Sequence, residues 1–323
     1  MPHNKAAAAY DNVTRKRKDD WSSQQVAFRH FANFVKKTLI QYSLDCVLSN
    51  ATASPSEGAA VLDLASGRGG DIGKWLFMRS PAHSNPHAPS DALHTSFYDC
   101  YDVSVECITE AERRYKETIA AIERPPQCRA SFTVADCFSE SFLRVTLPSS
   151  PRCGCYNVVS IQFAFHYACK SLDLIRDVLF AVSHALTPGG VVIITTVDIA
   201  MLSKRAAEGM LGNELYSISF SNPLEYTMAS NGSALLVAGT EYHFRLDGFV
   251  DCPEYVVPYD SVVEIAREAR LLLCERMSKP FSEFVLDYST NWKANKGNRL
   301  SQAELELVTL YRTLCFVKEK VTP

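Results

Sequence analysis

The 323-residue sequence has no long hydrophobic run and no strong excess of charge of either sign. No apolar stretch approaches the ~20 residues that a membrane-spanning helix needs, and the amino terminus has no hydrophobic core of the kind that secretory signals carry. A formal net charge of −3 disfavours a broad surface for duplex DNA, although a small basic patch could still hold the end of a nucleic acid. We therefore expect neither a membrane nor duplex DNA as a partner.

Paired cysteines are also missing. The eleven cysteines include no C-x-x-C pair and follow no regular spacing. Several lie in apolar surroundings, as free thiols do in a reducing compartment, so we expect neither a disulfide framework nor a zinc site. The apolar fraction of 47% and the charged fraction of 21% are typical of a globular domain.

The amino-terminal end is predicted to be a disordered basic tail over residues 1–20, followed by a single domain over 21–323. The tail carries Arg15-Lys16-Arg17-Lys18, followed at once by two aspartates. This cluster is compatible with a nuclear-import signal, with a contact to RNA phosphates, or with a solvated charged tail. We expect a nuclear protein, with the cytoplasm as the alternative.

The most informative stretch is V-L-D-L-A-S-G-R-G-G-D-I-G-K-W, residues 61–75. Its apolar start predicts a buried parallel strand, its glycines a tight turn, and Asp71 the opening of a helix. Such a turn lets a ligand lie against bare backbone. The G-x-G-G spacing differs from the G-x-G-x-x-G of dinucleotide folds, and Asp63 would repel a pyrophosphate but suit a cationic amine. This favours S-adenosylmethionine (AdoMet), with an ordinary strand–helix turn as the alternative.

Strand and helix patterns alternate along the rest of the chain. An amphipathic helix is expected from residue 26 to about 44, ahead of the first strand. We expect strands at 61–64, 94–101, 132–134, 156–163, 191–196, 271–274 and 314–317, and helices at 102–115, 172–186 and 259–269. Strand-like pieces at 216–220, 235–237 and 242–246 indicate an antiparallel insertion over about 210–252, and loops are expected at 80–91 and 291–299. Thr187-Pro188-Gly189-Gly190 is expected to end the helix over 172–186, with the strand following at once. This order predicts an α/β fold with a mostly parallel seven-stranded sheet, helices on both faces, and the insertion after strand five.

Polar residues follow several of these strands. In an α/β sheet the ligand lies outside the carboxyl ends of the strands, and an acid after the second strand binds ribose hydroxyls. Asp102 is the preferred candidate because a helix begins directly after it, and Asp99 is the alternative. Asp136 follows the third strand and could accept the amine of adenine, while Q-F-A-F-H-Y over 162–167 follows the fourth.

Seven phrases carry a more specific resemblance. They are F-A-N-F-V-K-K-T-L-I, the glycine-turn stretch, A-D-C-F, Q-F-A-F-H-Y, L-T-P-G-G, G-N-E-L-Y-S-I-S-F and V-D-C-P-E-Y, in that order between residues 21 and 318. In these phrases the sequence resembles the eukaryotic mRNA cap guanine-N7 methyltransferases. The resemblance implies a class I, Rossmann-like methyltransferase fold, AdoMet as methyl donor, S-adenosylhomocysteine as product, and the 5′ GpppN end of capped RNA as substrate.

The resemblance also implies roles for individual residues. On the AdoMet side it indicates Lys36 for the carboxylate, Asp63, Ala65 and Gly67 for the turn, Asp102 for the ribose, Asp136 for the adenine, and Gln162 and Tyr167 for the methionine end. Ala65 stands where the family usually has glycine, which would crowd the contact slightly. On the cap side it indicates Asn33, Arg68, Lys74 and Arg114 near the guanosine and its triphosphate, and His166, Glu254 and Tyr311 in the guanine pocket.

The implied reaction is an in-line methyl transfer to guanine N7, which has a free lone pair and needs neither a general base nor a metal. Glu254 would accept hydrogen bonds from the guanine edge, and His166 would help to position the base. A methyltransferase for small molecules and a non-catalytic AdoMet-fold partner subunit are the alternatives, and a capping-apparatus protein is a conceivable partner. A second, guanylyltransferase activity is disfavoured because the resemblance to the methyltransferases already extends over residues 21–318 and because no K-x-D-G motif is present.

Overall fold

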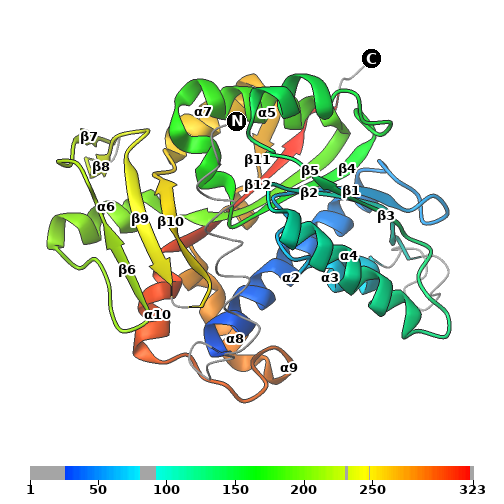
Figure 1. The fold of residues 1–323 in the computed structure, drawn as a ribbon, viewed down its shortest axis with the longest axis horizontal. Helices are drawn as coiled ribbons and strands as arrows, with labels where there is room; N and C mark the ends of the chain where they lie inside the picture. Colours follow the sequence, from blue (N-terminus) through cyan, green and yellow to red (C-terminus); the bar gives the residue numbers. More distant parts are fainter. Residues whose placement is uncertain (1–25, 81–91, 230–231, 247, 321–323) are drawn as a thin grey trace.

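The computed structural model describes residues 26–80, 92–229, 232–246 and 248–320 (Figure 1). The predicted tail over 1–20, with its basic cluster, and nearly all of the predicted loop over 80–91 lie outside the described residues. None of the helices in the described ranges is long and apolar enough to cross a membrane.

A seven-stranded sheet forms the centre of the domain, as predicted. Its strand order is β11-β12-β5-β4-β1-β2-β3, with β12 antiparallel to both of its neighbours and the other pairs parallel. The chain runs outward from β1 in one direction and from β4 in the other, so the strand order switches between these two strands, which is where such sheets bind ligands. The strands are β1 (Ala59–Leu64), β2 (Thr95–Asp102), β3 (Arg129–Val134), β4 (Tyr156–Gln162), β5 (Leu186–Val197), β11 (Leu271–Leu273) and β12 (Tyr311–Lys318).

Helices cover both faces of this sheet (Figure 1). One face carries α2 (Val26–Ser49), α3 (Ile72–Phe77) and α4 (Val105–Ala120), and the other carries α5 (Leu172–Ala185) and α7 (Tyr259–Glu268). The amphipathic helix predicted ahead of the first strand is α2, and its Phe31, Val35 and Leu39 are fully buried against the sheet. Its polar face is less solvated than its pattern suggests, because Asn33 and Lys36 are half-buried while Lys37 is exposed.

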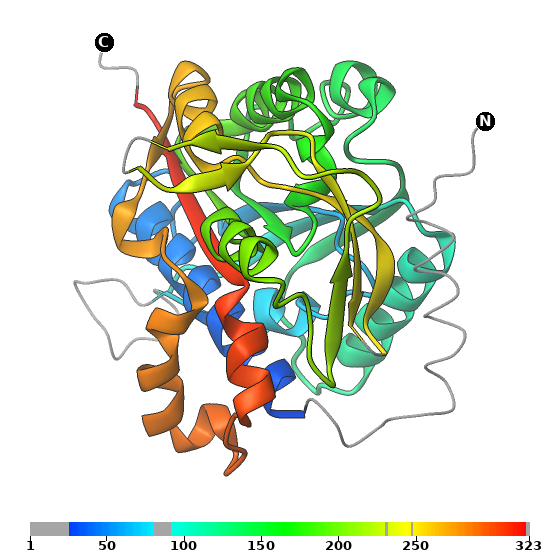
Figure 2. The same cartoon turned by 90° about the vertical axis from the view of Figure 1, so that its left-hand side faces the viewer.

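A small antiparallel sheet stands beside the main one (Figures 1 and 2). Its order is β10-β9-β6, and the side chains of β9 alternate between exposed and buried, so that one face covers the core. The helix α6 that precedes it was not predicted, and the Ser203 hydroxyl of this helix accepts a hydrogen bond from the β8 backbone at 2.9 Å. The elements are α6 (Ile199–Glu208), β6 (Tyr216–Ser219), β7 (Tyr226–Met228), β8 (Ala234–Leu236), β9 (Glu241–Leu246) and β10 (Val250–Tyr255).

The strand predicted to start at Val191 is longer than expected, because β5 begins at Leu186 directly after α5 and includes residues 187–190. Register pairs Tyr156 with Leu186 but Val158 with Val191, so these four residues form a bulge opposite one residue of β4. Gly189 takes a positive φ of 79°, and its carbonyl accepts a hydrogen bond from the Asn50 amide at 2.9 Å. A side chain at Gly189 would meet Thr52 at 2.8 Å.

Short helices occupy much of the segment between the last two strands. The predicted polar loop over 291–299 is wrong for Trp292–Asn295, which form α9, and confirmed for 296–299, which are turn and irregular structure. The fold of the segment depends on local caps: the Asn295 amide donates to the Tyr288 carbonyl at 3.2 Å, and Ser301 and Glu304 form a capping box. Glu304 also accepts a hydrogen bond from the Phe28 backbone at 2.8 Å, which fixes the start of α2. The elements are η4 (Glu275–Met277), η5 (Phe281–Phe284), α8 (Val285–Thr290), α9 (Trp292–Asn295) and α10 (Gln302–Thr309); two short helices elsewhere are η2 (Phe142–Thr146) and η3 (Phe165–Lys170).

Candidate active site

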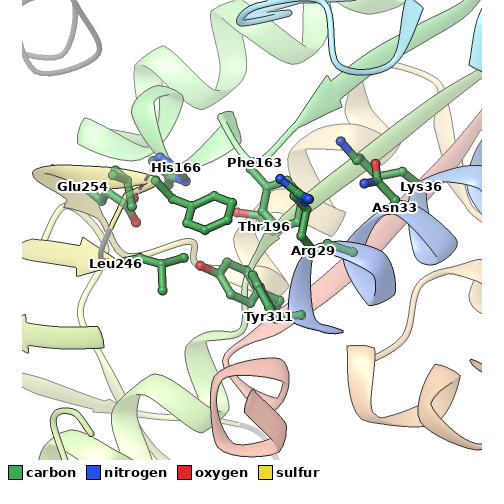
Figure 3. Close-up of a pocket in the computed structure, with 13 residues that line it drawn as sticks. Arg29, Asn33, Lys36, Phe163, His166, Thr196, Leu246, Glu254 and Tyr311 are labelled. Atoms are coloured by element: carbon green, nitrogen blue, oxygen red, sulfur yellow. Dashed lines mark ion pairs between the residues drawn. The ribbon is translucent and has the colours of Figure 1, made fainter. Parts of the chain in front are cut away.

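Two cavities meet at the carboxyl ends of the central strands. The larger, of about 610 Å³, lies over the glycine turn between β1 and α3 and is called the glycine-turn cavity. The smaller, of about 220 Å³, lies between the start of α2, η3 and the small sheet and is called the α2 cavity (Figure 3). Both linings include Lys36 and Phe163, so a ligand in one cavity would come close to a ligand in the other.

The glycine-turn cavity brings together every residue predicted for AdoMet. Its lining includes Lys36, Asp63, Ala65, Gly67, Asp102, Asp136, Gln162 and Tyr167. Gln162 Oε1 is buried and has no hydrogen-bond partner among the described residues, whereas its amide nitrogen donates to the Ile193 carbonyl at 3.2 Å. A buried acceptor that the protein leaves unsatisfied fits a ligand that supplies a donor, such as an ammonium group.

The geometry favours Asp102 over Asp99 as the acid that meets a ribose. Asp102 lines the glycine-turn cavity, and its two carboxylate oxygens accept hydrogen bonds from the Gly67 and Ser104 backbone at 2.8 and 2.9 Å. A carboxylate oxygen can accept more than one hydrogen bond, so a ligand hydroxyl could also donate to Asp102. Asp99 is instead held by other groups, because Arg152 contacts both of its oxygens at 2.6 and 2.7 Å and Tyr156 donates to it at 2.7 Å.

Asp63 is buried at the end of β1, where Tyr98 donates a hydrogen bond to it at 2.5 Å. Burial, together with the nearby charge of Asp71, raises the pKa of Asp63 to about 7. A buried acid in this state is stabilised in its ionised form by any cation that enters the cavity. This is the property expected of a residue that faces a cationic ligand.

The glycine turn itself contains one strained residue. Ala65 has a φ of +55°, a left-handed conformation that glycine adopts without cost and that costs an alanine roughly 1 kcal/mol. The crowding predicted at Ala65 therefore affects the backbone conformation as well as the side chain. At Gly67 and Gly70 an added side chain would meet nothing within 4 Å, so their backbone is open to the cavity.

Two lysines share one carboxylate between the cavities. Asp71 pairs with Lys36 at 2.9 Å and with Lys74 at 2.5 Å, and Lys74 also donates to the Asn33 side chain at 2.8 Å. Burial raises the pKa of Asp71, but the two lysines outweigh it and lower the pKa to about 2. Asp71 was expected only to open a helix. Its place in the sequence between Lys36 and Lys74, two predicted site residues, was the signal that could have identified it. Lys74 is buried, not an exposed helix charge.

The α2 cavity contains only part of the set predicted for the cap. Asn33, His166, Glu254 and Tyr311 line it, whereas Arg68, Lys74 and Arg114 are not among the described residues that line either cavity. Arg114 instead pairs with Glu110 on α4 at 2.7 Å. The roles predicted for these residues stay predictions. The lining also includes residues that were not predicted, namely Phe28, Arg29, Phe163, Thr196 and Phe249.

Buried polar groups without partners converge on the α2 cavity (Figure 3). Both ring nitrogens of His166 and the Thr196 hydroxyl lack a hydrogen-bond partner within the described part of the chain. Burial lowers the pKa of His166 to about 3 and raises that of Glu254 to about 7, although Tyr242 donates to Glu254 at 2.7 Å. The 3.5 Å contact between these two residues is therefore not an ion pair at neutral pH. Unsatisfied groups of this kind indicate a polar ligand.

Phe163 separates the two cavities in a strained conformation. Its φ is +56°, and its backbone N–H donates to the Thr195 hydroxyl and carbonyl, each at 2.9 Å. Its ring makes an edge-on contact with Tyr311, with centroids 5.2 Å apart. A positive φ at an aromatic residue is uncommon and clusters at functional sites. No pattern in the sequence indicates this conformation.

Within the described ranges, no group of three His, Cys, Asp or Glu side chains is placed to hold a metal ion.

Comparisons with known proteins assign the family. A family model described as the mRNA (guanine-N(7))-methyltransferase domain matches residues 3–313. An mRNA cap guanine-N(7) methyltransferase of Drosophila melanogaster is 28% identical over 80% of this chain and 56% of its own length, and one of Arabidopsis thaliana is 30% identical over 86% of this chain and 70% of its own. The crystal structure of a S-adenosylmethionine-dependent methyltransferase from Clostridium acetobutylicum is 13% identical, with a TM-score of 0.47 over 96% of this chain and 99% of that one. The chain belongs to the mRNA (guanine-N(7))-methyltransferase domain family.

Proposed function

We propose that this protein transfers the methyl group of AdoMet to N7 of the guanine in the 5′ GpppN cap of mRNA. The observation that carries the proposal is the meeting of two different cavities at Lys36 and Phe163. The glycine-turn cavity is lined by acids and by bare glycine backbone, as a cationic nucleoside requires. The α2 cavity is in the size range of a base, and its lining includes buried polar groups that have no partner among the described residues. When bound, AdoMet supplies an electrophilic methyl group on its sulfonium.

In the glycine-turn cavity the protein residues bind and orient the donor. Asp102 would accept from the ribose hydroxyls, and Asp136 from the adenine amine. Lys36 would meet the carboxylate at the methionine end, while Gln162 Oε1 and the raised pKa of Asp63 suit the ammonium group. The fit rests on the acids, the lysine and the amide that line this cavity.

In the α2 cavity Glu254 would accept hydrogen bonds from guanine N1–H and from the 2-amino group. Its pKa of about 7 means that the carboxyl is ready to ionise when these donors arrive. The carboxylate then lies next to a ring that becomes cationic as N7 is methylated, which stabilises the transition state. His166 stays neutral, so it can donate from one ring nitrogen and accept at the other while it holds the base in place.

The chemistry needs little beyond this arrangement. Guanine N7 has a free lone pair, so no proton has to be removed and no metal ion has a task in the step. Placing two substrates in line can supply roughly 7–11 kcal/mol. Arg68, Lys74 and Arg114 would contribute to holding the triphosphate, and we propose that Arg29 joins them because it lines the α2 cavity.

The test is a methylation assay with labelled AdoMet and the purified protein. Substrates are GpppG-RNA, GpppA-RNA, free GTP and a panel of small amines, and nuclease digestion separates N7 from ribose methylation. We expect label at N7 of the cap guanine in both RNAs. Label on the ribose, or transfer to amines with none to the capped RNAs, would contradict the proposal.

The cellular location of the protein and its protein partners are also proposals. We propose nuclear import through the cluster at 15–18, and a fluorescent fusion that lacks these residues should then spread into the cytoplasm.

A further inference from the structure

A group of thiols and one phenol lies away from both cavities, between α2 and the edge of the main sheet. The Tyr42 hydroxyl lies 2.9 Å from the Cys274 sulfur. The thiol of Cys315 is close enough to affect the pKa of Cys274, and Cys46, one turn beyond Tyr42 on α2, is close enough to affect the pKa of Tyr42. All four side chains belong to the apolar core on the α2 face of the sheet.

Cys274 and Cys315 are cross-strand neighbours. Leu273 pairs with Phe316 in the antiparallel β11–β12 ladder, and the Cys274 backbone N–H continues that ladder to the Cys315 carbonyl at 2.8 Å. The Cys315 N–H donates to the Ser278 hydroxyl at 2.9 Å, so only one bond of the pair is made. Opposite residues of antiparallel strands carry their side chains on the same face, with Cβ atoms about 4.5–5.5 Å apart. A disulfide needs Cβ atoms roughly 3.5–4.5 Å apart, so the two sulfurs can bond if the end of the ladder closes by about 1 Å, and Cys274 lies just past the last residue of β11.

The two thiols differ in exposure and in acidity. Cys274 is partly accessible, whereas Cys315 is completely buried. The Cys315 thiol, assisted by Tyr42, holds the pKa of Cys274 well below its usual range, although burial opposes this. The Cys274 thiol and burial raise the pKa of Cys315 well above its usual range. A nucleophilic, accessible thiolate beside a resolving thiol is the arrangement found in redox-sensing cysteines.

We propose that Cys274 and Cys315 form a peroxide-sensitive pair, in which Cys274 is the reactive thiol and Cys315 the resolving one. The Cys274 thiolate attacks one oxygen of hydrogen peroxide, the O–O bond breaks, and the leaving hydroxide takes a proton to give water and a Cys274 sulfenic acid. The Cys315 sulfur then attacks the Cys274 sulfur, the S–O bond breaks, and the hydroxyl leaves as a second water with the Cys315 proton. Two thiols are oxidised to a disulfide and one peroxide is reduced to two waters.

The cysteine pair contacts α2, the helix whose residues line both cavities. Tyr42 lies on α2 together with Asn33 and Lys36, and its hydroxyl contacts the sulfur that would be oxidised. This inference does not depend on the proposed methyl transfer, and its test is chemical.

The first experiment uses the wild-type protein, hydrogen peroxide in slight excess, and peptide mapping by mass spectrometry after alkylation of the remaining thiols. We expect a Cys274–Cys315 linked peptide that dithiothreitol removes. Cys155, which is exposed, is the internal control. Because the thiolate is the reactive species, iodoacetamide at pH 6 should modify Cys274 at least about tenfold faster than Cys155.

Variants then separate the two roles. In Cys315→Ser, oxidation should stop at a Cys274 sulfenic acid that dimedone captures, whereas Cys46→Ser should form the disulfide at the wild-type rate. Tyr42→Phe should slow the alkylation of Cys274 at pH 6. A Cys274–Cys46 bond, oxidation of Cys155 ahead of Cys274, or a wild-type map without a cross-link would each overturn the proposal, whether or not any variant folds.

Discussion

Replacing Glu254 with glutamine should make the protein more stable and less active at the same time. The carboxyl is buried, and burial raises its pKa from 4.5 to about 7. Each tenfold change in proton affinity corresponds to about 1.4 kcal/mol, so the ionised carboxyl destabilises the ligand-free fold by roughly 3 kcal/mol. An uncharged amide of nearly the same shape avoids this penalty and can still accept the hydrogen bond from Tyr242.

The sign of the pH dependence follows from proton linkage. Between pH 4.5 and about 7 the folded protein binds this proton and the unfolded chain does not, so wild-type stability falls as the pH rises through that interval. Below about pH 4.5 both states are protonated and the glutamine variant gains nothing. Urea denaturation at pH 4.5 and at pH 8 should therefore show an advantage for Glu254→Gln that grows from near zero to roughly 3 kcal/mol.

Activity should change in the opposite direction. A carboxylate about 4 Å from a ring that becomes cationic contributes about 4 kcal/mol at an effective dielectric constant of 20, so kcat/KM for GpppG should fall on the order of 10²–10³-fold. Glu241→Gln, an exposed change on the neighbouring strand β9, is the matched control and should leave activity unaltered. Near-wild-type transfer to GpppG, or a stability gain independent of pH, would refute the reasoning.

Three further substitutions test other parts of the site. Thr196→Val removes the unsatisfied hydroxyl but keeps the shape, so KM for capped RNA should rise about tenfold, KM for AdoMet should not change, and Thr196→Ser should restore binding; equal values for valine and serine would contradict this. Lys36→Met should weaken AdoMet binding, measured by calorimetry, by roughly 1.5–3 kcal/mol, while the exposed Lys37→Met should have no effect, and a loss shared by both variants would argue against a specific contact. Ala65→Gly should leave the free energy of unfolding within about 1 kcal/mol of wild type, because relief at positive φ is offset by a more flexible unfolded chain; Ala65→Val should cost at least about 1 kcal/mol in urea denaturation, and tolerance of valine would mean that the backbone is not strained.

The glycine-turn cavity could be anticipated because its residues follow from local patterns. Strand patterns place Asp102, Asp136 and Gln162 at the ends of parallel strands, and the ends of parallel strands meet at one edge of a sheet. The α2 cavity was harder to anticipate. In the sequence, Thr196 cannot be distinguished from the other residues of a buried strand. Phe163 differs from its neighbours only in its positive φ, which the whole fold imposes.

The late start predicted for β5 and the missed helix α9 have a similar origin. Thr187-Pro188-Gly189-Gly190 has the composition of a turn, but contacts with Asn50 and Thr52, distant in sequence, hold it as a bulge of β5. The segment over 291–299 has no helical periodicity because α9 is a single turn, fixed by the cap that Asn295 provides to α8. Local patterns miss elements whose stability comes from such long-range or one-residue contacts.

The carboxylate shared by Lys36 and Lys74 has a consequence for how the two substrates affect each other. Two lysines and one aspartate carry a combined charge of +1, so this group can neutralise one anion but not two. If the AdoMet carboxylate pairs with Lys36 and the cap triphosphate with Lys74, each ligand reduces the positive potential that attracts the other. Thermodynamic reciprocity then requires that donor and cap weaken each other's binding by the same factor, and that this factor shrinks as salt screens the charges. The site would thus release its products more readily than either affinity alone suggests.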